Sequence, residues 1–175
     1  IFHCHTHLIP RRDGDTPNPR GGVRGVIPNK MNYPSVSSEH NKNIEKIRQT
    51  YRPEKIQLLF IGESAPAKGN FFYVKSPMTA YTSRAFENAH KISFKDNTNF
   101  LHYFKKCNCF LDDVSHSPVN QLPPKQREET LHKSIVPLSL RIQEYNPTVI
   151  VIFLKKIEHF VREAVEKSHC NAEVH

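Results

Sequence analysis

The stretch Thr148-Val149-Ile150-Val151-Ile152-Phe153-Leu154 decides the fold class of this chain, because it is continuously apolar and rich in β-branched residues. Such a run is typical of a strand that is buried on both faces of a parallel sheet. A second run of strand length, Ile56–Ile61, ends at a glycine, and Phe110–Val114 is predicted as a short strand or edge segment. Segments of helical character lie between these runs. The alternation predicts an α/β fold with a central, mostly parallel sheet flanked by helices.

Five helices are predicted around this sheet from the spacing of apolar side chains and from the residues that end each segment. They cover residues 36–50, 78–90, 97–107, 126–145 and 157–168. The first is interpreted as a linker helix within residues 35–52, which leaves residues 53–175 as the α/β domain. Pro137 is expected to kink the helix in which it lies.

Composition limits the class of protein. The 175 residues carry a formal net charge of +8, which suits a nucleic acid or a polyphosphate ligand. No apolar run approaches the ~20 residues of a membrane helix, and no signal peptide is recognised, so no membrane partner is expected. The cysteines have no disulfide spacing and are interpreted as reduced thiols of a cytoplasmic protein. Cys107 and Cys109 with His102 are a weak metal signal, so neither a metal nor another cofactor is predicted.

Three histidines at strand spacing open the chain in the segment Ile1–Ile9. Side chains alternate along a strand, so His3, His5 and His7 are expected to project from one face. Three imidazoles close together fit a nucleophile with its supporting groups, a zinc site, or a histidine-rich strand end without chemistry. The seven residues alone leave these alternatives open.

The residues that follow extend this pattern. After the histidines come Ile9-Pro10-Arg11-Arg12 and then Gly21-Gly22-Val23-Arg24. Residues 1–34 therefore resemble the C-terminal end of a histidine-triad (HIT) domain, an α+β fold whose family transfers or hydrolyses nucleotidyl groups.

The HIT resemblance implies a catalytic role for each histidine. His5 would attack the α-phosphorus and form a nucleotidyl-histidine intermediate, His3 would fix the tautomer of His5, and His7 would bond a phosphate oxygen or the leaving group. A purine nucleotide or nucleotide conjugate is the implied ligand, and a homodimer is the implied assembly if the domain is complete. Most of a HIT domain precedes its triad, so we expect this chain to be a fragment of a longer protein.

A second resemblance concerns residues 53–175. The loop Gly62-Glu63-Ser64-Ala65-Pro66-Ala67 follows the first predicted strand, and Gly69-Asn70-Phe71-Phe72-Tyr73 comes next. This loop is similar to the first motif of the uracil-DNA glycosylase superfamily, with one residue inserted. A late His-Pro-Ser-like loop and an iron–sulfur cysteine pattern of that superfamily are absent from this sequence.

The second resemblance implies base and DNA contacts at Gly62, Glu63, Pro66, Asn70, Phe72 and Tyr73. Glu63 or Asn70 would orient a water, and Phe72 or Tyr73 would stack on a flipped base. Phosphates would meet Lys68, Lys75 and Arg84. Structural interpretations remain open: the aromatic residues could be core, Glu63 could cap a helix, and Asp112-Asp113 is expected at the surface.

The leading hypothesis is therefore HIT-type nucleotidyl hydrolysis or transfer at His5, fused to a glycosylase-like domain. One alternative is a DNA-binding or uracil-excising α/β domain with a non-functional HIT remnant. Another is an interaction protein without catalytic activity.

Overall fold

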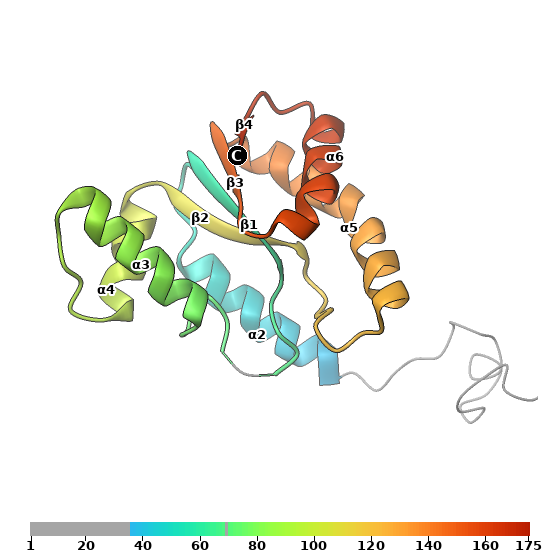
Figure 1. The fold of residues 1–175 in the computed structure, drawn as a ribbon, viewed down its shortest axis with the longest axis horizontal. Helices are drawn as coiled ribbons and strands as arrows, with labels where there is room; N and C mark the ends of the chain where they lie inside the picture. The colour runs from blue at the N-terminus through green and yellow to red at the C-terminus, as the bar shows by residue number, and fades with distance from the viewer. Residues whose placement is uncertain (1–35, 69) are drawn as a thin grey trace, which may run out of the picture. The chain divides into compact units, whose positions relative to one another are not determined.

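The computed structural model describes residues 36–175 except residue 69, so the expectations for His3, His5 and His7 lie outside the described residues. The described chain forms an α/β fold around four parallel strands in the order β2-β1-β3-β4 (Figure 1). The strands are β1 (Leu58–Ser64), β2 (Cys109–Ser115), β3 (Val149–Ile152) and β4 (Glu173–Val174). The predicted parallel α/β architecture is confirmed.

The predicted helices are all present, and their ends agree to within two residues. They are α2 (Val36–Thr50), α3 (Pro77–His90), α4 (Asn97–Lys106), α5 (Pro124–Tyr145) and α6 (Glu158–Ser168), with a short 3₁₀ helix, η1 (Lys155–Ile157), before α6. Helix α5 continues through Pro137 from its first residue to its last.

Local sequence explains where helix α3 begins and ends. Ser76 is its N-cap, because the Ser76 hydroxyl accepts a hydrogen bond from the Thr79 N–H at 3.1 Å. Pro77 follows at the first helical position, where the missing N–H costs nothing. The helix ends at His90, and the capping residue Lys91 that follows adopts a left-handed conformation with φ of 55°.

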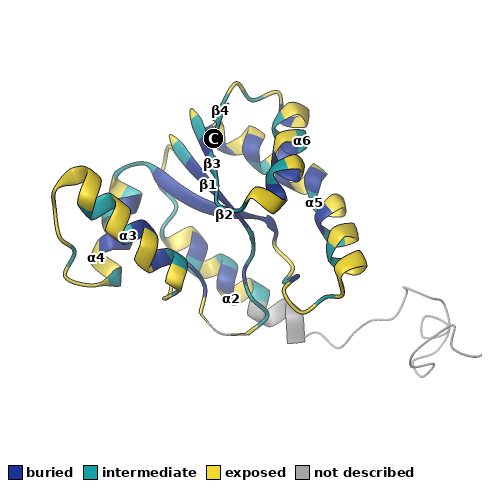
Figure 2. Cartoon of the chain, viewed as in Figure 1, coloured by how far each residue is buried: buried dark blue, intermediate teal, exposed yellow. Residues whose placement is uncertain are grey.

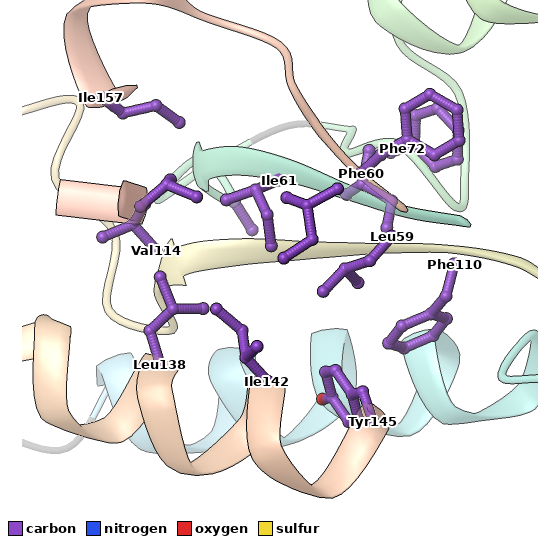
Figure 3. Packing of buried hydrophobic residues seen from close by; sticks show 14 of the residues in the cluster. Leu59, Phe60, Ile61, Phe72, Phe110, Val114, Leu138, Ile142, Tyr145 and Ile157 are labelled. Carbon is purple, nitrogen blue, oxygen red and sulfur yellow. The ribbon is translucent and has the colours of Figure 1, made fainter. Parts of the chain in front are cut away.

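Alternate residues of β1 belong to the two layers of the core (Figure 3). Leu59 and Ile61 are fully buried and lie on the side of α5, toward Leu138 and Ile142 (Figure 3). Phe60 lies on the opposite side, with its ring centroid 5.4 Å from that of Phe104 in α4. Figure 2 shows that the helices are buried on the side that faces the sheet and exposed on the side that faces away from it.

The observed β1 strand differs from the apolar run that predicted it. It begins two residues later, at Leu58, and continues through Gly62-Glu63-Ser64, which follow the predicted strand. Those polar residues remain in the sheet because Gly62 pairs with Asp113 and Ser64 pairs with Ser115 in β2. The chemically informative residues therefore lie on a rigid strand end.

Strand β2 is at one edge of the described sheet, and Tyr73 satisfies part of that edge. The Tyr73 hydroxyl accepts a hydrogen bond from the Leu111 N–H at 2.7 Å and donates to the Leu111 carbonyl at 2.9 Å. The ring of Tyr51, directly after α2, stacks on Tyr73 with centroids 5.6 Å apart. Tyr73 is thus a structural residue that closes an edge that would otherwise leave backbone groups unpaired.

Substituting Tyr73 with phenylalanine should lower the free energy of unfolding by about 1–3 kcal/mol, because both backbone groups of Leu111 would lose their buried partner. Urea unfolding measures this change, and hydrogen exchange of the Leu111 amide should become faster. Tyr81→Phe is the matched control, since Tyr81 is 71% exposed. Equal stability of the two variants would contradict this role for Tyr73.

Candidate functional site

A pocket lies at the carboxyl ends of β1 and β2, the position where open α/β sheets bind ligands. Its volume is about 340 Å³, which is within the range of small-molecule sites. We call it the β1–β2 pocket. It is lined by Gly62, Glu63, Ser64, Ala65, Pro66, Asn70, Phe71, Phe72, Ser76, Pro77, Met78, Leu111, Asp113 and Leu154.

The pocket brings together most of the residues that the sequence singled out in this region. Gly62, Glu63, Pro66, Asn70 and Phe72 all line it, although they are spread over a strand end and a loop. Tyr73 is not among the lining residues: it is only 2% exposed, and its hydroxyl is bound to Leu111. The three histidines near the N-terminus lie outside the described residues, so this structure does not relate them to the pocket.

Asp113, which the sequence was expected to place at the surface, also lines the pocket. Its Oδ1 lies so close to Gly62 that a Cβ added to Gly62 would be 2.4 Å from it. Only glycine at this position leaves room for the carboxyl group, which explains the glycine at the end of an apolar strand. Its Oδ2 accepts a hydrogen bond from Arg48 Nη2 at 2.6 Å. Within the described chain, no group donates a hydrogen bond to Oδ1.

Asp112 points to the other side of the same strand. Its Oδ1 accepts from Arg48 Nη1 at 2.8 Å and from the backbone N–H of Asp113 at 2.7 Å. Its Oδ2 accepts from Arg141 Nε at 2.7 Å and from the Tyr145 hydroxyl at 3.2 Å. His116 Nε2 lies 2.8 Å from Oδ1.

The expectation that Asp112 and Asp113 lie at the surface is wrong. Asp112 is 0% exposed and Asp113 is 5% exposed. The two side chains do face opposite ways, as adjacent strand residues must. They are buried because both faces of β2 are packed, against α4 on one side and α5 on the other. Arginines on α2 and α5 compensate their charges.

The two carboxyl groups have opposite pKa shifts. Burial alone would raise the pKa of Asp112, but Arg48, the hydrogen bond to His116 and Arg141 outweigh it and hold this pKa well below its usual range. Burial dominates for Asp113, whose pKa is raised although Arg48 opposes the shift. Asp112 is thus held as an anion, whereas the ionised form of Asp113 is disfavoured by burial.

Glu63 is held by cations of two other elements. Arg127 of α5 forms a bidentate pair with its carboxylate, and Lys156 of η1 donates to Oε2 at 3.0 Å. Burial would raise the pKa of Glu63, but the hydrogen bonds from Arg127 and Lys156 lower it overall. Such a carboxylate is a weak proton acceptor, and it joins the end of β1 to α5 and η1.

A second groove adjoins the pocket. It has a volume of about 670 Å³ and shares Asn70, Ser76 and Pro77 with the β1–β2 pocket. Lys75, Arg84 and Glu87 also line it. The carboxylate of Glu87 is engaged by the backbone, since its Oε1 accepts a hydrogen bond from the Phe94 N–H at 2.8 Å. Two cations therefore lie within reach of a ligand that extends out of the pocket.

Residues 36–175, apart from 69, contain no group of three or more His, Cys, Asp or Glu side chains arranged to hold a metal ion. None of their helices combines the length and the apolar character needed to cross a membrane. Comparisons with protein-family models, with curated proteins and with solved structures find no match to this chain. The β1–β2 pocket and the sequence motifs are therefore the features that bear on function.

Substituting Asp112 with asparagine should lower the free energy of unfolding by about 3–5 kcal/mol near neutral pH, because the buried guanidinium of Arg48 and the partly buried one of Arg141 would lose their shared counter-charge. The pKa of Asp112 is lower in the folded chain than its unfolded value of about 3.9. Its stabilising contribution is therefore fully present above about pH 4 and is lost as the pH falls further. Urea unfolding across this range should show the gap between wild type and variant shrinking on acidification.

Glu158→Gln is the control for this experiment, since the Glu158–Arg162 ion pair lies on the exposed side of α6. Its effect should stay below about 1 kcal/mol at every pH. A difference in unfolding free energy between wild type and Asp112→Asn that stays constant into strong acid would contradict the lowered pKa of Asp112.

Proposed function

We propose that the α/β unit binds a nucleobase in the β1–β2 pocket and acts on DNA as a base-excising domain of the uracil-DNA glycosylase type. The observation that carries the proposal is a pocket at the carboxyl ends of β1 and β2 in which one carboxyl oxygen of Asp113, Oδ1, has no hydrogen-bond partner among the described residues. A carboxyl oxygen that receives no hydrogen bond from the protein in the wall of a pocket is available to a donor group of a ligand.

The walls of the pocket suit a planar heterocycle. Phe71, Phe72 and Leu154 contribute apolar surface, whereas Asn70 and Asp113 contribute polar groups. A nucleobase has the same character, with apolar faces and a polar edge. This match supports a single unstacked base as the ligand.

The proposed reaction is hydrolysis of the bond between base and sugar. A water oxygen bonds to the sugar carbon C1′, the bond from C1′ to the base nitrogen breaks, and the base departs and takes up a proton. We assign the orientation of this water to Asn70, because the carboxylate of Glu63 is already bound by Arg127 and Lys156. Glu63 instead keeps the end of β1 in place.

The adjoining groove supports a polynucleotide rather than a free base as the substrate. A strand that leaves the pocket past Asn70 and Ser76 would meet Lys75 and Arg84. Cations on such a path neutralise phosphates and make binding dependent on salt.

The test is binding and cleavage of labelled single-stranded DNA that carries one uracil. Anisotropy should detect binding at low salt that weakens as salt is added, and released uracil should be detected by chromatography. Asn70→Ala should reduce the rate of release by roughly 10²-fold, the usual scale for a residue that positions a reactant. Asn171→Ala, at an exposed position, should have no effect.

Absence of DNA binding at low salt would remove this proposal. It would favour an interaction protein without catalysis, for which substitutions in the loop of residues 62–77 should be tolerated. Binding without release of uracil would leave a base-binding domain and contradict the assigned reaction.

A second candidate function rests on the motif His3-Cys4-His5-Thr6-His7. Its proposed chemistry is HIT-type nucleotidyl transfer or hydrolysis at an α-phosphorus, with His5 as the nucleophile and a purine nucleotide or its conjugate as substrate. Neutral imidazole is a good nucleophile near pH 7 when a neighbour fixes its tautomer.

His5→Ala should abolish hydrolysis of an adenosine phosphoramidate by the complete protein, while circular dichroism shows an unchanged fold. His175→Ala, a histidine that is 57% exposed in its side chain, serves as the control and should leave turnover intact. Unchanged turnover in His5→Ala would exclude the nucleotidyl-histidine mechanism.

A further inference from the structure

Arg48 connects the two buried carboxyl groups of β2. It lies on α2 and is 1% exposed. Its guanidinium straddles the edge of the strand, with Nη1 bound to Asp112 and Nη2 bound to Asp113. Because these carboxyl groups face opposite sides of the sheet, one planar fork holds both at once.

The two carboxyl groups differ in how many donors surround them. Both oxygens of Asp112 are occupied, by Arg48, by Arg141 and Tyr145, and by a backbone N–H. From the described residues, the Asp113 carboxyl receives a hydrogen bond only from Arg48, at Oδ2. Oδ1 is left over Gly62, in the wall of the β1–β2 pocket. The side chain of Asp113 cannot exchange the two oxygens without breaking its bond to Arg48.

We propose that Arg48 is a positioning residue that fixes the orientation of Asp113 and thereby the hydrogen-bonding character of the pocket. Arg48 always requires an acceptor at the Oδ2 position. The oxygen that remains, Oδ1, is the single polar atom that Asp113 offers to the ligand. In the ionised carboxylate this atom is an acceptor, so the pocket selects a base edge with an N–H at that point. The inference rests on the proposed base-binding function.

Asp113→Asn follows from this arrangement as a diagnostic variant. An amide has one acceptor and one donor group. Arg48 can only bind the amide oxygen, so the NH₂ group must turn toward Gly62 and the pocket. A substitution of nearly identical shape therefore replaces an acceptor in the pocket with a donor. Without Arg48 the amide would be free to adopt either orientation.

The experiment compares the dissociation constants of uracil and cytosine by NMR titration of the full chain. These bases have the same shape, but their donors and acceptors on one edge are exchanged. Asp113→Asn should change the ratio of the two dissociation constants by about tenfold, the effect of one hydrogen bond gained or lost, and should reverse which base binds more tightly. Arg48→Met/Asp113→Asn removes one positive and one negative charge together and leaves Asp112 paired with Arg141. This double variant should bind the two bases within about threefold of each other. Arg52→Met, which removes an arginine paired with Glu144 outside the pocket, should leave the preference as in wild type.

A measurement without ligand separates this inference from the function on which it rests. In Asp113→Asn, nuclear Overhauser contacts should join the side-chain NH₂ group introduced at position 113 to the Gly62 α-protons. If no base binds wild type, the proposed function fails, and this contact still tests the orientation. An NH₂ group directed toward Arg48 would overturn the inference. An unchanged preference between uracil and cytosine in Asp113→Asn would also overturn it. The same holds if the double variant discriminates between the two bases as strongly as wild type does.

Discussion

The guanidinium group of Arg48 compensates the charges of two adjacent buried carboxyl groups at the edge of this sheet. Two adjacent carboxyl groups in a buried strand would be strongly destabilising without a counter-charge, because burial removes the water that solvates them. Arg48 binds both, and Arg141 adds a second cation on the side of α5. The ion pairs of Arg48 therefore tie α2 to the edge of β2. The same ion pairs define which polar atom faces the β1–β2 pocket.

The pocket and the fold share their supporting residues. Gly62 pairs with Asp113 in the sheet, and its lack of a Cβ leaves space for the carboxyl group of Asp113. Glu63 links β1 to α5 and η1 through Arg127 and Lys156. Tyr73 satisfies the outer edge of β2 next to the pocket. A site built from strand ends and fixed by such contacts is rigid before a ligand arrives, which lowers the entropic cost of binding.

Local patterns in the sequence predicted the helices, the strands β1, β2 and β3 and the α/β class, because apolar runs and capping residues act over a few positions. The short strand β4 (Glu173–Val174) was not predicted. They also identified the loop of residues 62–73 as the place to look for a ligand. They failed for Asp112 and Asp113, since burial of these residues depends on which strand is at the edge and which helices cover it. Arg48 carried no local signal either, because its partners are 64 and 65 residues away in the chain. Adjacent aromatic residues were ambiguous for the same reason: only the fold shows that Phe72 lines the pocket while Tyr73 binds the strand edge.

The position of Arg48 has a consequence for how the polypeptide can be divided. A chain that began at residue 53, where the sequence suggested a domain boundary, would keep the whole sheet and lose the cation that both aspartates share. Asp112 would keep Arg141, but the buried carboxyl group of Asp113 would have to take up a proton or move toward water. The shortest autonomous folding unit is therefore longer than the sheet and its connecting helices, and it must include the last turns of α2.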